Sequence, residues 1–279
     1  MSFAGIYGHF EDNTSIPCKR YTINPAPYGG CNRDTLQVFS IKVTELTGGL
    51  QWPLNVFGMV AFRDSLDHNR NVIFKRERAN SQTLTNENPY LVLSGPVRGV
   101  VLGAPVVVEV LLNVRGTSEP DDKELSLVAA DFGRFFNPQQ DSCLISKSFT
   151  SRLSTLDFEL GHIACSVEAT ISVKVISGPA DGFHGEFTAC TDALEREVIL
   201  HNSSVEELHH VGDEIKLSRS VISVESSGKL MVSVKASDGS VTSMGTKEFK
   251  PAEKGITTGE LSIADLCHLE ISVAWSLFS

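Results

Sequence analysis

The sequence predicts an all-β fold made of two abutting antiparallel sandwich-like modules, with few or no long helices. Three observations support this prediction. Several segments alternate apolar and polar residues with a period of two, which is the pattern of a strand with one solvated face. No segment carries an apolar stripe with helical spacing. The same short landmarks also recur, in the same order, in both halves of the chain.

The alternation is clearest in residues 106–114, 167–175 and 269–277, where apolar residues, mostly Val, Leu and Ile, occupy every second position. The strand parity predicts that Trp275 points into the core. It places Glu109 and Glu168 on the faces that meet solvent. Ionisable groups are therefore expected to be dispersed over the solvent-exposed surface instead of gathered in a buried cleft.

The recurring landmarks predict that the two modules arose by duplication of one unit. They keep their order while the spacing between copies shortens along the chain, as it does when a second copy loses loop residues. Five pairs carry this signal: residues 41–43 with 173–175, 70–73 with 196–199, 93–94 with 217–218, 108–110 with 232–234, and Cys165 and Glu168 with Cys267 and Glu270.

The predicted organisation has three parts. Residues 1–33 are rich in Pro and Gly and read as an extended or partly ordered arm. Residues 34–165 form the first β module and residues 166–279 form the second. The strand 167–175 could be shared by the two modules. One large sandwich is the alternative. Within the second module, Ser227-Gly228 predicts a hairpin between residues 221–225 and 230–236.

Composition and charge limit the classes of function. The net charge of −10 argues against general nucleic-acid binding, which requires Lys and Arg to displace phosphate counterions. No run approaches the roughly 20 apolar residues of a membrane-spanning helix, and no secretory signal is recognisable at the start. The six cysteines lack C-x-x-C spacing, so reduced thiols in a cytoplasmic or nuclear setting are expected. Cys165 and Cys267 share the parity of core residues.

The sequence has no motif that predicts catalysis. A G-x-S-x-G elbow, a G-x-G-x-x-G turn and a Walker-type phosphate loop are all absent. His201, His209 and His210 lie near Glu206 and Glu207, but their spacing favours a solvated loop over a metal site. We therefore expect no enzyme activity, no catalytic residue, no cofactor and no metal.

Two segments are candidates for a partner-binding surface. The first connects two predicted strands and is dense in polar groups: Asp64, Asp67, His68 and Arg70. The second is a loop with Phe132, Phe135 and Phe136, which either fold into the core or form a contact patch. A calcium site on the first segment is an alternative, to which Asp121 and Asp122 could contribute, because calcium takes about six to eight oxygen ligands from several loops.

Several stretches are specific enough to indicate a family. They are TLQVFSIKV at 35–43, GGLQWPLNVFG at 48–58, RDSLDHNRN at 63–71, NPYLVLSGP at 88–96, STLDFELGH at 154–162, VEATISV at 167–173 and VAWS at 273–276. Together they resemble an uncharacterised plant domain family abundant in cereals. Its members occur alone or as the C-terminal part of the jasmonate-induced ribosome-inactivating protein.

The resemblance implies a plant intracellular protein associated with stress or defence, and it brings no catalytic residue. The N-glycosidase half of the fused relative needs Glu and Arg one turn apart on a helix, and Glu195-Arg196 lies instead where a strand begins. We therefore expect a non-enzymatic interaction module that binds a protein partner. The alternatives are a translation-related or rRNA N-glycosidase-associated protein, and a calcium- or lipid-binding β-sandwich.

Overall fold

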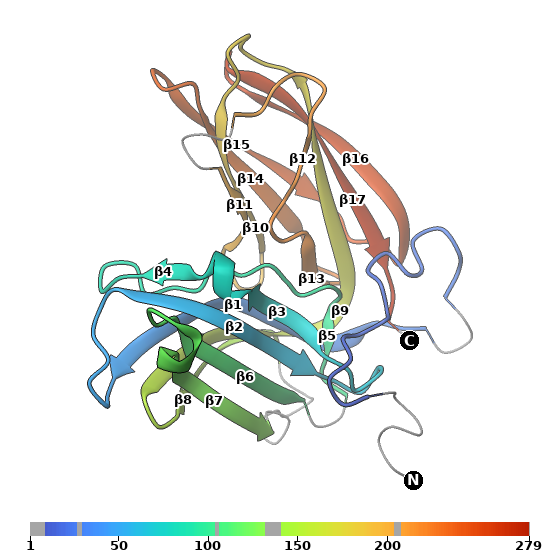
Figure 1. The fold of residues 1–279 in the computed structure, drawn as a ribbon. Coiled ribbons are helices and arrows are strands. Elements are labelled where there is room, and N and C mark those ends of the chain that lie inside the picture. The colour runs from blue at the N-terminus through green and yellow to red at the C-terminus, as the bar shows by residue number, and fades with distance from the viewer. Residues whose placement is uncertain (1–8, 27–29, 104–105, 132–140, 204–207, 279) are drawn as a thin grey trace. The chain divides into compact units, whose positions relative to one another are not determined.

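The structure, a computed structural model, describes residues 9–26, 30–103, 106–131, 141–203 and 208–278 (Figure 1). The regular elements are almost all strands, which confirms the predicted all-β fold. Two 3-10 turns, η1 (Arg78–Asn80) and η2 (Glu119–Asp121), are the only helical elements in these ranges. Within the same ranges, no helix has the length and apolar character needed to span a membrane.

The chain divides into two compact units. Unit 1 comprises residues 1–17 and 34–162, and unit 2 comprises residues 18–33 and 163–279. This border lies three residues before the one expected at residue 165. The predicted N-terminal arm is not a separate part, because its residues are distributed between the two units.

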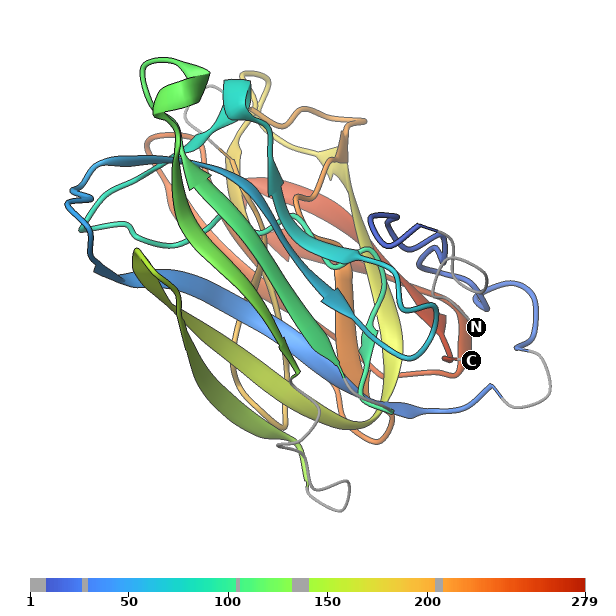
Figure 2. The ribbon, with the colours of Figure 1, turned by 60° about the horizontal axis from the view of Figure 1, so that its bottom comes forward.

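Unit 1 is built from two antiparallel sheets. One sheet has the order β3 (Asn71–Arg76), β2 (Leu54–Arg63), β6 (Val107–Val114) and β7 (Lys123–Asp131), with β4 (Gln82–Leu84) paired to β2. The other contains β8 (Cys143–Thr150), the first part of β9 (Ser154–Ser177), β1 (Arg33–Leu46) and β5 (Val100–Val101). In Figure 2 the green β6 and β7 run side by side. Phe62 and Phe158 meet edge to face in the core, with ring centroids 6.5 Å apart.

Unit 2 repeats this construction. One sheet has the order β11 (Val198–Asn202), β10 (His184–Thr191), β14 (Leu230–Ser237) and β15 (Thr242–Phe249). The other contains β16 (Lys254–Ile263), β17 (Cys267–Ser276) and the second part of β9, which also pairs with β12 (Glu214–Ile215) and β13 (Val221–Glu225). Trp275 is fully buried, as its parity predicted, and its Nε1 donates to Thr257 Oγ1 at 3.1 Å.

The strand orders support the internal duplication. The order β3-β2-β6-β7 of unit 1 corresponds to β11-β10-β14-β15 of unit 2. The landmarks at 108–110 and 232–234 fall in β6 and β14, which occupy equivalent positions. The fifth landmark pair does not correspond, because Cys165 and Cys267 both lie in unit 2.

The predicted hairpin at Ser227-Gly228 is wrong. β13 has the predicted bounds and β14 ends one residue later than predicted, but β13 pairs with β9 whereas β14 pairs with β10 and β15. The turn therefore carries the chain from one sheet of unit 2 to the other. The hairpin lies one turn later, where β14 and β15 pair over their full lengths.

Two strand residues differ from their predicted environment. Glu168 is 4% exposed, because Lys19 of the predicted N-terminal arm covers it and donates its backbone N–H to Glu168 Oε1 at 3.0 Å. Cys165 is exposed and not in the core, and its backbone has a φ of 45°. This left-handed conformation interrupts the alternation in the middle of β9. Cys267 is buried as predicted.

Candidate functional site

The Asp64–Arg70 segment is a compact loop between β2 and β3. Its own side chains close it: the N–H of Leu66 donates to Asp64 Oδ1 at 3.0 Å, and the N–H of Asn69 donates to Asp67 Oδ1 at 3.2 Å. These are Asx-type turns, which Asp favours because its short carboxylate reaches a backbone donor two residues on. His68 adopts a left-handed φ of 57° at the tip. The loop is therefore a defined structure.

One side of the loop is held by a buried ion pair. Arg98 donates from Nη1 to Asp64 Oδ2 at 2.6 Å and from Nη2 to Asp64 Oδ1 at 2.8 Å, a bidentate pair. Its Nη2 also donates to Asp67 Oδ1 at 3.0 Å. Burial works against the charged form of Arg98, but hydrogen bonds and charge from the two aspartates outweigh it and raise the pKa of Arg98. Asp64, at 1% exposed, also accepts the N–H of Val101.

The other side of the loop is held by Glu109 of β6. Arg63 donates to Glu109 Oε2 from both Nε and Nη2, at 3.1 and 2.9 Å, and Arg70 pairs with the same carboxylate. Burial of Glu109 opposes its ionisation, but the hydrogen bonds from the two arginines prevail and lower the pKa of Glu109. The expectation that Glu109 faces solvent is therefore wrong, since two guanidinium groups cover its outward face.

A segment of the same unit, with a β-turn at residues 9–12 and a bridge at Asn13, lies on this loop. We call residues 9–14 the N-terminal segment. Its Thr14 N–H donates to the carbonyl of Arg70 at 2.9 Å, and the Arg70 N–H donates to the carbonyl of Asp12 at 3.0 Å. Asn13 and Arg70 form a parallel bridge. The loop thus pairs with the main chain of the segment as one strand pairs with another.

Arginine side chains bind the same segment. Arg63 Nη2 donates to the carbonyl of Phe10 at 2.6 Å, and Arg70 Nη1 donates to the carbonyl of Glu11 at 3.2 Å. The guanidinium carbon of Arg63 lies 4.0 Å from the centre of the Phe10 ring, a cation–π contact. The Thr14 hydroxyl donates to Asp67 Oδ2 at 2.6 Å and accepts from Arg98 Nε at 3.2 Å. We call these binding groups of Arg63, Asp67, Arg70 and Arg98 the loop site.

The structure brings the predicted loop residues together, but not as an open surface. Asp64 lies below the surface, so a partner cannot contact it while its pair with Arg98 stays intact. The side chain of Asp67 contacts the N-terminal segment through Oδ2, and the side chain of Arg70 contacts it through Nη1. His68 is half-buried at the loop tip. Phe132, Phe135 and Phe136 lie outside the described residues.

Three important members of the site were missed from the sequence. Arg63 ends a strand, Arg98 follows a loop far along the chain, and Phe10 belongs to the irregular arm. Three arginines and three acids meet here, and their formal charges cancel. Only the fold shows which of the many charged residues meet.

The carboxylates considered above as calcium ligands already have other hydrogen-bond or ion-pair partners. Asp121 accepts from Ser118 in a capping box of η2, and Asp122 pairs with Arg78 at 2.8 Å. In the loop, a guanidinium lies between Asp64 and Asp67. Among the described residues, no three His, Cys, Asp or Glu side chains are grouped as metal ligands.

The predicted solvated histidine loop is also corrected. His201 and His209 are buried, with ring centroids 5.7 Å apart, and both contact the ring of Phe187. His201 belongs to β11 and His209 bridges to Phe183. They form part of an aromatic cluster inside unit 2.

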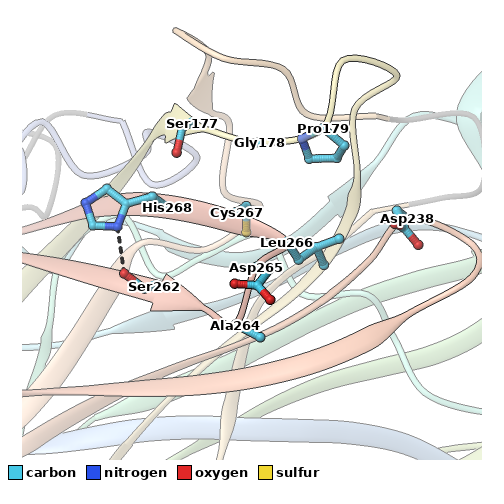
Figure 3. Close-up of a pocket in the computed structure, with 10 residues that line it drawn as sticks. All are labelled: Ser177, Gly178, Pro179, Asp238, Ser262, Ala264, Asp265, Leu266, Cys267 and His268. Atoms are coloured by element: carbon cyan, nitrogen blue, oxygen red, sulfur yellow. Dashed lines mark hydrogen bonds between the residues drawn. The ribbon is translucent and has the colours of Figure 1, made fainter.

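Unit 2 also carries a hollow of about 410 Å³ beside the turn between β16 and β17 (Figure 3). On its rim Ser262 Oγ and His268 Nδ1 lie 2.9 Å apart. His268 Nε2 lies 3.1 Å from Glu260 Oε2. Ser, His and Glu thus form a hydrogen-bonded relay of the kind that activates a nucleophile. Glu260 is largely exposed, so water screens its charge.

Two other ionisable side chains that line the hollow are unsuited to act as a nucleophile or a general base at neutral pH. Burial raises the pKa of the Cys267 thiol to about 11, so the thiolate is scarce. Backbone hydrogen bonds from Val241 and Ser240, with the Ser240 hydroxyl, lower the pKa of Asp238 to about 2. Asp238 is therefore ionised and stabilises its own turn.

Comparison with known proteins gives a family match without a function. The protein family described as "Domain of unknown function (DUF6598)" matches residues 35–273. No curated protein matches the sequence.

Several solved structures show a distant similarity. Human GIVD cytosolic phospholipase A2 is 10% identical with a TM-score of 0.28, covering 88% of this chain and 32% of that chain. The paired C2 domains of Extended-Synaptotagmin 2 with calcium bound are 11% identical with a TM-score of 0.27, covering 90% of this chain and 99% of that chain. The chain thus spans about a third of the phospholipase. TM-scores this low establish no common fold.

Proposed function

The chain belongs to the family of domains of unknown function DUF6598, and we propose that it is a non-enzymatic module that binds a peptide segment of a protein partner at the loop site. One observation carries the proposal: the loop already holds the main chain of residues 10–14, a turn followed by a strand-like bridge, through guanidinium and backbone donors. Addition of an extended segment to exposed main-chain groups is a recurring mode of peptide recognition.

The electrostatics of the loop site support recognition over catalysis. Each acid of the site pairs with a guanidinium, so its oxygens already serve as hydrogen-bond acceptors. The lowered pKa of Glu109 points the same way, because a general base needs a pKa close to the working pH. Such a site binds through fixed donors and aromatic contact.

The biological setting of the proposal rests on the sequence resemblance described above. We place the protein in the plant cytoplasm, in a stress or defence response, without rRNA N-glycosidase activity of its own. An adenine-release assay on intact ribosomes tests the last point. Release at nanomolar protein would overturn it.

Photo-cross-linking tests the binding proposal at the loop. A photoreactive phenylalanine analogue replaces His68 at the loop tip, and the control chain carries it at Met244, an exposed residue of unit 2. In extract from stressed tissue, we expect saturable cross-linking of one protein from position 68 and not from position 244. Equal labelling from both positions, or none from position 68, would refute binding at the loop.

The relay in unit 2 supports a second candidate function, ester or acyl hydrolysis in the hollow. The 2.9 Å contact between Ser262 and His268 favours it, since a general base must reach the nucleophile. Hydrolysis of an activated ester by the wild type and Ser262→Ala is the test. A rate that falls to background in the variant would favour the enzyme, and equal rates would favour the binding module.

A further inference from the structure

We infer that the N-terminal segment is an internal competitor for the loop site, and that the partner segment presents the same chemistry: an aromatic residue, then an acidic residue, then a hydroxyl four positions after the aromatic. This inference rests on the proposed binding function and names the partner's chemistry. The segment His9–Thr14 is itself the model of what the site accepts.

The side chains of the segment show what the site distinguishes. Phe10 stacks on Arg63, which a smaller or acidic side chain at that position could not do. Four residues later, the Thr14 hydroxyl fits between Asp67 and Arg98, donating to one and accepting from the other. A hydroxyl satisfies both neighbours because it is donor and acceptor at once.

Of the two acidic residues between them, Glu11 acts on Arg70, whereas Asp12 accepts the His9 N–H within the segment. The charge of Glu11 contributes to the raised pKa of Arg70, after the dominant hydrogen bond to Glu109. The Glu11 carbonyl also accepts from Arg70 Nη1. The site therefore favours acid beside the aromatic residue, even though the whole chain carries a net charge of −10.

The segment is held at the surface and can leave without exposing a core. Residues 9–13 are exposed, and the Phe10 side chain is 59% exposed. When the segment leaves, Arg63 and Arg70 keep their partner Glu109, and Arg98 keeps Asp64. The loop site therefore survives empty, with its outward guanidinium donors and the Arg70 carbonyl available for a new strand.

The tether makes the segment an effective competitor. A segment joined to its site by a short chain acts at an effective concentration of roughly millimolar. A partner segment of equal chemistry must overcome this advantage. Weakening the internal segment should therefore strengthen binding from outside.

A labelled peptide tests this on the full chain. The probe is a fluorescent peptide of residues 9–17 (HFEDNTSIP), and its affinity is measured by anisotropy for the wild type and for Phe10→Ala/Thr14→Val. We expect the double variant to bind the probe about tenfold tighter or more, from the loss of two contacts in the internal segment. Matched peptides carrying Phe10→Ala or Thr14→Val should bind the variant about tenfold weaker.

The outcomes separate this inference from the binding proposal. Two results would overturn the inference that the N-terminal segment competes for the loop site. One is a folded double variant that binds the probe no better than the wild type, and the other is a pair of substituted peptides that bind as well as the probe. If the double variant fails to fold, excess probe on the wild type must raise proteolytic cleavage within residues 9–14, and unchanged cleavage would overturn it. Cross-linking from position 68 that the probe does not displace would leave the proposed function standing without the competitor.

Discussion

Arg63 holds Phe10 in two ways: its Nη2 donates to the Phe10 carbonyl at 2.6 Å, and its guanidinium carbon lies 4.0 Å from the centre of the Phe10 ring. The same guanidinium is fixed from behind by Glu109. A cation with a buried anchor and an outward face is preorganised to receive a main-chain oxygen and an aromatic ring. This relationship is the structural basis of the recognition site proposed at the Asp64–Arg70 loop.

The buried pair of Arg98 and Asp64 should be essential for stability. Arg98→Met leaves Asp64 buried without its counter-charge, so we expect a loss of about 3 to 5 kcal/mol in urea unfolding. Arg78→Met is the matched control, since it removes a half-buried partner of Asp122 that water still reaches and should cost clearly less. Adding Asp64→Asn to Arg98→Met should recover part of the loss. Equal effects at the two arginines would contradict this account of the loop.

Stability should depend on pH through Glu109. Its pKa in the folded chain is below the ordinary value of 4.5, so its contribution is present above pH 4.5 and is lost as the pH falls through the folded pKa. Glu109→Gln should therefore be less stable than the wild type at pH 7, and the difference should narrow in acid. Chemical denaturation from pH 3 to pH 7 measures this, with a constant difference as the contrary result.

Gly58 should tolerate no side chain. Its φ is 117°, and an added Cβ would collide with the carbonyl oxygen of Leu111 on the neighbouring strand. We expect Gly58→Ala to cost about 3 kcal/mol from backbone strain and collision together. Gly49→Ala is the control, because Gly49 also has positive φ but has open space around it. Thermal unfolding should show a clearly smaller shift for the control.

Calcium should not bind the loop. Arg98 already bonds to both Asp64 and Asp67, and a calcium ion would have to displace a guanidinium that is 2% exposed. Calorimetry with calcium should give no saturable heat. Saturable heat that disappears in Asp67→Ala would contradict this and restore the calcium interpretation.

The alternation of residues was sufficient to predict the strands and the burial of Trp275. Parity also placed Glu109 and Glu168 correctly on the outer faces of their strands. Their burial could not be predicted, because Arg63 and Arg70 cover Glu109 and the main chain of Lys19 covers Glu168. A local pattern tells which way a side chain points and not what lies above it.

The loop site was predictable only in part. The density of Asp and Arg in residues 63–70 indicated a structured polar loop, and the loop does gather those residues. Arg98 could not be assigned to it, since that contact spans 34 residues and depends on the order of the strands. The false hairpin at Ser227-Gly228 has the same origin: turn chemistry predicts a turn and not which sheet the next strand joins.

Native-state hydrogen exchange tests most directly whether the N-terminal segment is a displaceable occupant of the loop site. The Thr14 amide donates to Arg70, and the Val110 amide belongs to the buried centre of β6. We predict that the Thr14 amide exchanges about a hundredfold faster or more than that of Val110, by local opening. Equal protection of the two amides would show that the segment leaves only when the unit unfolds, and would contradict the account.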